Sequence, residues 1–238
     1  MPIRSLLPFA LLLVLAPFSA ASGQSCSRAA WYLAHGDADR ALRALTGLAD
    51  GSETNVRGLA EMMKGELDAA LATFTRALEE DPGSLETRFN RGIVLLRLDR
   101  PDEAAAVFEA VWSEKDARPS LRASAADHRA LAAERLGRLD EASAWLDRSL
   151  AIDSRSPDAL LYSGVVLEKR GRFAEAAKRY RAYLDNDPGS ILAMLRFGIV
   201  AHRAGHRDLA VKYLREVAAR SPDSLEAVEA RKFLVMWE

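Results

Sequence analysis

Two histidines in the last third of the chain have the spacing that best suits chemistry. His202 and His206 lie four residues apart, which can place two imidazoles on one face of a helix beside a metal ion, and Asp208 is close by. Gly205 lies between them, however, and glycine favours the end of a helix. We therefore expect the shared face to be lost and the two histidines to be turn or surface residues, with no metal site.

The remaining ionisable side chains form no catalytic pattern. Glu134 and Glu168 have basic neighbours, but neither has a second carboxylate at a spacing that suggests an acid–base pair. The sequence contains no G-x-S-x-G motif, no H-E-x-x-H motif and no glycine-rich phosphate loop. We therefore predict a protein that is not an enzyme and that needs no cofactor, with these glutamates on solvated helix faces.

The single cysteine, Cys26, excludes an internal disulfide and a cysteine-based metal site. Three alternatives stay open for this residue: a free thiol, a link to another chain, or a lipidated cysteine after a leader segment. Gly23 and Gln24 fit the lipoprotein pattern poorly, which favours an unmodified thiol.

Residues 1–23 have the layout of a secretory signal peptide. Arg4 is followed by an apolar run from Leu6 to Phe18 and then by small residues, with cleavage sites after Ala21 or Gly23. The run is shorter than the ~20 residues of a membrane-spanning helix. We predict export to the bacterial periplasm or the extracellular space. The alternatives are an uncleaved N-terminal anchor, which would place the chain at a membrane, and a lipoprotein.

Composition indicates an all-α fold with little net charge. The 238 residues carry 33 lysines and arginines against 34 acidic residues, and the two signs are interspersed. Such a chain lacks the basic field of a nucleic-acid binder, so we expect no nucleic-acid partner. Alanine, leucine, arginine and glutamate dominate, and these residues favour helices.

The same small and large residues recur at a period near 34. Turn glycines at Gly137, Gly171 and Gly205 are 34 residues apart, and the register reaches back through Asp99 to Gly65 and, more loosely, to Gly36. Small residues facing a large one let two helices pack closely. Three further columns of residues keep a fixed distance from the turns. A glycine precedes the turn at Gly58, Gly92, Gly164 and Gly198. An alanine follows it at Ala41, Ala70, Ala104, Ala142, Ala176 and Ala210, and then a large residue at Leu45, Phe74, Phe108, Leu146, Tyr180 and Leu214.

These columns resemble the tetratricopeptide repeat, a helix-turn-helix unit of about 34 residues. The resemblance covers most of residues 27–224. It implies a right-handed superhelical α-solenoid of about six repeats with a C-terminal capping helix. We divide the chain into a signal peptide (1–23), an atypical N-terminal repeat (24–53), the repeat array (54–224) and the capping helix (225–238).

Two local features carry further expectations. Asp99 and Gly137 are 38 residues apart, and we place the four extra residues in a longer surface loop between Lys115 and Arg122, with a hinge or docking loop as the alternative. The capping helix should expose a polar half and pack Trp237 against the last repeat, with a contact to a partner as the alternative for Trp237.

The resemblance also implies a binding groove lined by the first helix of each repeat. A basic column two residues before each turn would form its edge, at Arg97, Arg135, Lys169 and Arg203. The same column would also arise simply because cations suit the last turn of a helix. The implied groove residues are Asn55, Leu59, Met62, Phe89, Asn90, Ile93, Arg97, His128, Leu131, Arg135, Leu161, Tyr162, Val165, Lys169, Leu195, Arg196, Ile199, His202 and Arg203.

The resulting hypothesis is a non-catalytic exported scaffold that binds a peptide or a helix of another protein. It would act in the assembly of an envelope or secretion complex. The alternative is a periplasmic chaperone-like assembly factor that binds transiently, of the cytochrome maturation or pilus pilot type. The sequence leaves the partner's identity and the oligomeric state open.

Overall fold

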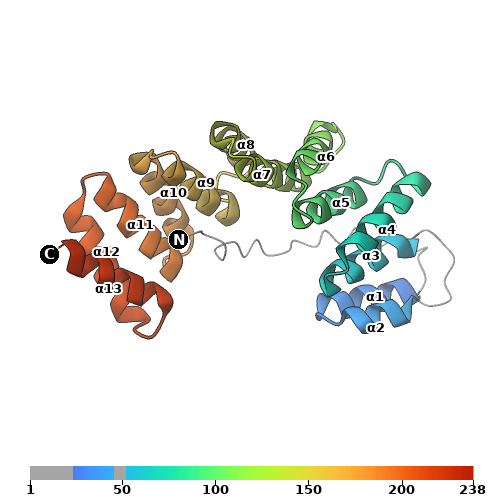
Figure 1. The fold of residues 1–238 in the computed structure, drawn as a ribbon, viewed down its shortest axis with the longest axis horizontal. Coiled ribbons are helices and arrows are strands. Elements are labelled where there is room, and N and C mark those ends of the chain that lie inside the picture. The colour runs from blue at the N-terminus through green and yellow to red at the C-terminus, as the bar shows by residue number, and fades with distance from the viewer. Residues whose placement is uncertain (1–23, 46–51, 238) are drawn as a thin grey trace. The chain divides into compact units, whose positions relative to one another are not determined.

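The computed structural model describes residues 24–45 and 52–237, and every regular element in these ranges is an α-helix (Figure 1). The all-α class is therefore confirmed. None of the described helices has the length and apolar character needed to cross a bilayer. The predicted signal peptide lies outside the described residues. The helices are α1 (Gln24–Ala34), α2 (Ala38–Ala44), α3 (Ser52–Lys64), α4 (Leu67–Glu80), α5 (Leu85–Arg97), α6 (Pro101–Ser113), α7 (Pro119–Arg135), α8 (Leu139–Ile152), α9 (Pro157–Lys169), α10 (Phe173–Asn186), α11 (Ile191–Arg203), α12 (Arg207–Arg220) and α13 (Leu225–Trp237).

The helices follow one another as hairpins, with α13 as an additional helix. The chain forms two compact units, one up to Ala132 and the other from Ala133, so that the boundary falls within α7. In the first unit α3 packs against α4 and α5 against α6, and in the second α9 packs against α10 and α11 against α12. The predicted division at residues 53 and 224 stays a prediction.

Hydroxyl side chains start several of the first helices. Ser84, Ser156, Ser190 and Ser224 each accept a hydrogen bond from the backbone N–H three residues later, at distances of 3.1–3.4 Å. Such caps stabilise a helix by about 1 kcal/mol each because they satisfy an N–H that has no partner within the helix. The caps therefore keep the starting point of each hairpin in the same register.

The predicted turn residues adopt the left-handed backbone conformation that ends the first helix. The glycines at these turns have φ between 73° and 89°. Asp99 takes their place in the third hairpin with φ 58°, and α6 then begins at Pro101. Aspartate adopts this conformation more readily than most residues with a side chain. The turn column is thus confirmed, including its one replacement.

The small-and-large packing code is also confirmed. In four hairpins the large residue of the second helix lies directly over the glycine of its own first helix. A Cβ added to Gly164 would lie 2.5 Å from the ring of Tyr180, and one added to Gly198 would lie 2.9 Å from Leu214. Phe74 and Phe108 cover Gly58 and Gly92 in the same way. Glycine is needed at these positions because any side chain would push the two helices apart.

The prediction that the four extra residues form a longer surface loop between Lys115 and Arg122 is wrong. The loop covers only residues 114–118, whereas α7 has 17 residues and α5, α9 and α11 have 13 each. Four residues make about one helical turn, so the insertion lengthens α7 without rotating its later residues to another face. Leu121 in this added turn is buried, as is Ala123 directly after it. Pro119 begins the helix, where proline is tolerated.

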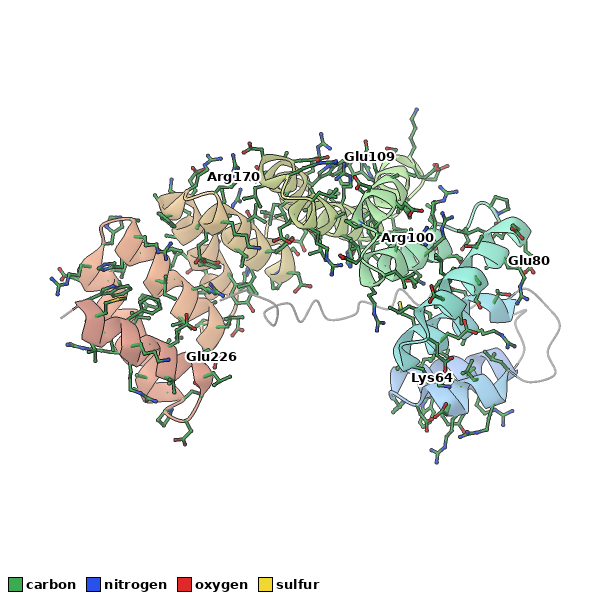
Figure 2. All side chains as sticks on the ribbon, in the orientation of Figure 1. Lys64, Glu80, Arg100, Glu109, Arg170 and Glu226 are labelled. Carbon is green, nitrogen blue, oxygen red and sulfur yellow. The ribbon has the colours of Figure 1, made fainter. Side chains whose placement is uncertain are left out.

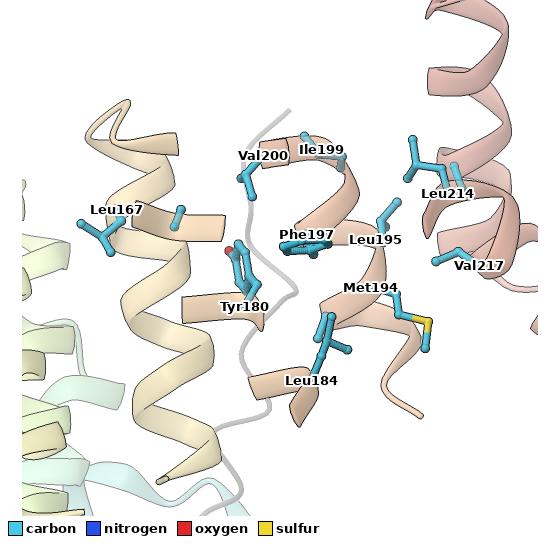
Figure 3. Close-up of a cluster of buried hydrophobic side chains, with 13 residues drawn as sticks. Leu167, Tyr180, Leu184, Met194, Leu195, Phe197, Ile199, Val200, Leu214 and Val217 are labelled. Atoms are coloured by element: carbon cyan, nitrogen blue, oxygen red, sulfur yellow. The ribbon is translucent and has the colours of Figure 1, made fainter. Parts of the chain in front are cut away.

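The hydrophobic core of the second unit passes from hairpin to hairpin (Figure 3). Tyr180 and Leu184 on α10 pack with Leu195 and Phe197 on α11, and Leu214 on α12 belongs to the same cluster. Each hairpin therefore completes its core only with the side chains of its neighbour, as expected of stacked repeats.

The capping helix α13 confirms one expectation and contradicts another. The ring of Trp237 stacks on His202, with centroids 3.7 Å apart, so Trp237 is packed as predicted. The outer face of α13 is not uniformly polar, however, because Leu225, Val235 and Met236 are exposed there beside charged residues such as Glu229 and Lys232. Among the described residues, no second helix covers this face as α12 covers the corresponding face of α11.

Candidate protein-binding surface

The structure places the predicted groove residues in two groups. The first group is buried and holds neighbouring helices together, so it offers a partner no surface: Leu59, Met62, Phe89, Asn90, Ile93, His128, Leu131, Tyr162, Leu195 and Ile199. The second group is exposed or half-buried: Asn55, Arg97, Arg135, Leu161, Val165, Lys169, Arg196, His202 and Arg203. Any partner contact on the first helices must therefore use the second group.

In the first unit, polar members of the predicted set link two first helices. Asn90 on α5 donates a hydrogen bond from Nδ2 to Oδ1 of Asn55 on α3 at 3.3 Å. Arg97 donates from Nη1 to the backbone carbonyl of Met62 at 2.7 Å. That carbonyl lies in the last turn of α3, where carbonyls lack a partner within the helix. Arg97 therefore caps the preceding first helix.

His128 is part of the core and is not a groove residue. Its ring centroid lies 5.0 Å from that of Phe89 and 5.3 Å from that of Phe108, and Nδ1 donates to the carbonyl of Ser124 at 2.9 Å. Burial lowers the pKa of His128 to about 4, against the smaller opposing effect of that hydrogen bond. The imidazole is therefore neutral near pH 7.

Another cation at the end of a first helix, Lys64, pairs with carboxylates of the first unit. Lys64, labelled in Figure 2, has its Nζ 2.9 Å from a carboxylate oxygen of Glu66 and 3.3 Å from one of Asp39. The hydrogen bond with Glu66 raises the pKa of Lys64 most, followed by that with Asp39. Both contacts are exposed, so they stabilise the fold only modestly.

In the second unit, carboxylates pair with two cations of the predicted groove, one of which, Lys169, belongs to the basic column. Lys169 on α9 pairs with Glu134 at the end of α7. Arg196 on α11 has Nη1 3.5 Å from Oε1 of Glu168, and the Tyr180 hydroxyl donates to Oε2 of the same carboxylate at 3.2 Å. These pairs join consecutive first helices. Lys169, one of the four residues of the basic edge, is therefore paired within the stack.

Two buried tyrosines stay protonated beneath this surface. Burial raises the pKa of the Tyr162 hydroxyl, and the nearby Glu134 carboxylate raises it further. Burial likewise raises the pKa of Tyr180, with Glu168 as the second cause. Both hydroxyls therefore act as hydrogen-bonding groups and not as bases.

A partly exposed patch remains on the first helices of the second unit. We call it the first-helix patch and define it by Leu161, Val165, Lys169, Arg196 and Arg203. Leu161 and Val165 are half-buried against the core. The guanidinium of Arg203 lies 5.1 Å from the ring centroid of Phe173 and is exposed. The patch thus has an apolar centre and a charged rim.

A hollow of about 410 Å³ lies over α10 and α11 and did not follow from the sequence reasoning. Phe197 lies among its lining residues, together with the basic side chains of Lys178, Arg181 and His206. It is assembled from two helices and the turn that follows α11, so no single stretch of sequence could have revealed it. Within the described ranges, no three His, Cys, Asp or Glu side chains gather as a metal site would require.

Comparison with known sequences supports the repeat register. Family models described as tetratricopeptide repeats match residues 28–84, 55–121, 89–157 and 129–191, and a further one matches residues 192–224. Together these matches cover most of the chain. No curated protein matches the sequence at a significant level.

Solved structures with the same arrangement of helices come from several repeat proteins. The type IV pilus biogenesis factor PilW is similar with a TM-score of 0.78 and 23% identity, over 88% of this chain and 97% of PilW. PilF of Pseudomonas aeruginosa gives a TM-score of 0.73 and 19% identity, over 87% and 95% of the two chains. YrrB, described as having an unusual peptide-binding site, gives 0.62 and 22%, over 77% and 92%. At these identities the likeness establishes the fold alone.

Proposed function

Since the chain belongs to the tetratricopeptide repeat family, we propose that it is a non-catalytic, exported scaffold that binds a peptide or a helix of a partner protein. The observation that carries this proposal is the first-helix patch. Its half-buried Leu161 and Val165 lie beside charged side chains, and protein interfaces combine an apolar centre with a polar rim in this way.

The chemistry of the patch indicates the kind of segment that it would bind. Leu161 and Val165 suit an apolar anchor residue. Arg203 is exposed and its guanidinium can form forked hydrogen bonds, so it suits a carboxylate of the partner. Lys169 and Arg196 are already paired with Glu134 and Glu168, so they contribute less to binding. The preferred partner segment is thus apolar, with an acidic residue near one end.

The proposed setting is the assembly of an envelope or secretion complex. The signal-peptide pattern of residues 1–23 supports export. The structural similarity to a type IV pilus biogenesis factor favours a second candidate, a periplasmic assembly factor of the pilus pilot type that binds only transiently. Quantifying the captured partner distinguishes the two, because a scaffold retains its partner in a constant ratio through purification and a transient factor loses it.

Site-specific photo-cross-linking tests the patch directly. The photoreactive residue p-benzoylphenylalanine replaces Leu161 or Val165, and Lys178 on α10 is the matched control because it is exposed in the same unit on a second helix. The full chain is expressed in its own host and irradiated, and adducts are identified by mass spectrometry. We expect a specific adduct at Leu161 and Val165 and none at Lys178. An equal yield at all three positions would reject the patch.

A charge reversal tests the role of the rim. Arg203→Glu should weaken capture of the cross-linked partner by about tenfold, because it replaces a favourable charge contact by a repulsive one. Lys178→Glu makes the same change in net charge elsewhere in the unit and should leave capture unchanged. Equal effects of the two variants would show a response to net charge alone and would contradict the assignment.

Export is tested separately from binding. Cell fractionation and the mass of the mature N-terminus show whether residues 1–23 are removed. Labelling with a palmitate analogue, compared between the natural chain and Cys26→Ser, tests lipidation. A full-length chain in the cytoplasmic fraction would contradict export.

A further inference from the structure

Helix α13 occupies the place of a first helix, and it is the last helix of the described residues. It begins 34 residues after α11, and both helices start at a capping serine, Ser190 for α11 and Ser224 for α13. Ala227 corresponds to Ala193, and both are buried. The contacts of α13 are with α12 and α11, as for a first helix stacked on the preceding hairpin. It therefore continues the register of the stack by half a repeat.

The outer face of α13 exposes four large apolar side chains beside Glu229 and Lys232. Leu225 is 84% exposed, Val235 78%, Met236 65% and Val228 40%. In α11 the positions equivalent to Val228 and Val235 are Met194 and Ala201, which are both buried. No described residue covers the corresponding face of α13. Several large apolar residues gathered on one exposed face are typical of an interaction surface.

A further repeat stacked in the usual way does not fit this face. Lys232 stands at the position of Gly198, where the first helix must be bare to accept a large residue of the second helix. A lysine there would hold such a helix away and bury its own charge. The occupant must instead offer a carboxylate opposite Lys232 and apolar residues on either side of it.

A second copy of α13, running antiparallel, meets these requirements. The first half of the helix carries Glu226 and Glu229 and the second half Arg231 and Lys232. Antiparallel pairing about the helix centre therefore brings acidic residues opposite basic ones twice, with Leu225 near the second copy's Met236. In the described structure neither Glu229 nor Lys232 makes an ion pair with another side chain.

We propose that two copies of this chain associate through the apolar outer faces of their α13 helices, with Glu229 of each copy against Lys232 of the other. Each α13 helix then covers the exposed face of the other, and the Glu229–Lys232 pairs take the place of the glycine contact within a hairpin. The interface is self-complementary, as two-fold symmetry requires. This inference is independent of the first-helix patch and of the proposed partner.

Sedimentation analysis of the purified full chain tests the association. We expect a species of twice the mass of one chain that dissociates on dilution. The double variant Leu225→Glu, Val235→Glu should raise the dissociation constant at least tenfold, because it places charges on the apolar face. Leu209→Glu on α12 is the matched control, since Leu209 is also an exposed apolar residue, and it should leave the dimer intact. A chain that stays monomeric at about 100 µM, or a dimer that is insensitive to the double variant, would overturn the proposal.

Charge exchange tests the antiparallel register. Glu229→Lys and Lys232→Glu should each weaken self-association, because each places like charges in contact twice. Mixing the two variants should restore it, since one copy then offers two lysines and the other two glutamates. The combined variant carrying both changes should also self-associate. Failure of both the mixture and the combined variant to recover association would reject this pairing, and circular dichroism melting curves exclude unfolding as the cause.

Discussion

The helices α11 and α13 begin 34 residues apart and differ in what covers them. In α11, Gly198 lies beneath Leu214 of α12, and residues from Ala193 to Ala201 are mostly buried. In α13, Lys232 replaces the glycine, and only Ala227 and Ala230 are buried. The same position in the repeat is thus enclosed in one helix and open in the other. The difference teaches that a residue's role depends on the neighbour that covers it as well as on its place in the repeat.

Exchanging the residues at the two equivalent positions should have the largest effect. Gly198→Lys should lower the free energy of unfolding by more than about 4 kcal/mol, because the side chain would displace Leu214 or bury its charge. Lys232→Gly should cost only about 1 kcal/mol through lower helix propensity. Denaturant unfolding measures both changes. Similar losses in the two variants would mean that α13 is as enclosed as α11.

The enclosed position of His128 predicts a dependence on pH. Its pKa is about 4 in the folded chain and 6.5 in the unfolded chain, so the unfolded state takes up the proton first. The contribution of neutral His128 to the free energy of unfolding is complete above pH 6.5 and is lost as the pH falls towards 4. Between pH 7 and pH 5 the natural chain should lose about 2 kcal/mol more than His128→Leu. Parallel profiles for the two proteins would show that His128 is not enclosed in solution.

Two arginines on the same helix compare a covered charge with an open one. Replacing Glu168, which lies beside the mostly buried Arg196, by glutamine should cost about 1 kcal/mol and leave Arg196 without its counter-charge. Arg203→Met should change the stability by less than about 0.5 kcal/mol, because Arg203 is exposed. Thermal unfolding at low and high salt measures both. A larger loss of stability from Arg203→Met than from Glu168→Gln would show that Arg203 is the covered charge and Arg196 the open one.

Small effects are also expected at the turns. Asp99→Gly should stabilise the chain by up to about 1 kcal/mol, since glycine adopts a φ of 58° without steric cost. Gly171→Asp should destabilise it by a similar amount, because the site has space for a side chain but requires positive φ. A loss of stability in Asp99→Gly would show that contacts of the aspartate outweigh its backbone strain.

Several features could be predicted from particular residues. The turn glycines, Asp99 as their replacement and the glycines beneath Phe74, Phe108, Tyr180 and Leu214 all followed from columns that repeat along the chain. The packing of Trp237 was also anticipated. These features depend on contacts within one hairpin or between consecutive hairpins. The same residue spacing therefore recurs in each repeat and makes them predictable from the sequence.

The predicted groove was less accurate because a first helix has several faces. Leu59, Phe89 and Tyr162 have the spacing of groove residues, yet the neighbouring hairpin covers them. The insertion before α7 resembled a loop because sequence spacing alone does not distinguish an added helical turn from an added loop. The matching of Lys169 by Glu134 joins residues 35 positions apart and required the stacked arrangement.

The amino-acid sequence by itself determined the all-α class, the period of the hairpins and the residues at their turns, because these depend on local backbone preferences and on side-chain volume. Only the tertiary structure decided which side chains remain exposed, which cations are paired and which face of α13 is uncovered. The physical reason is that burial and ion pairing depend on the neighbouring hairpin, and the sequence of one helix does not state which of its faces that neighbour will cover.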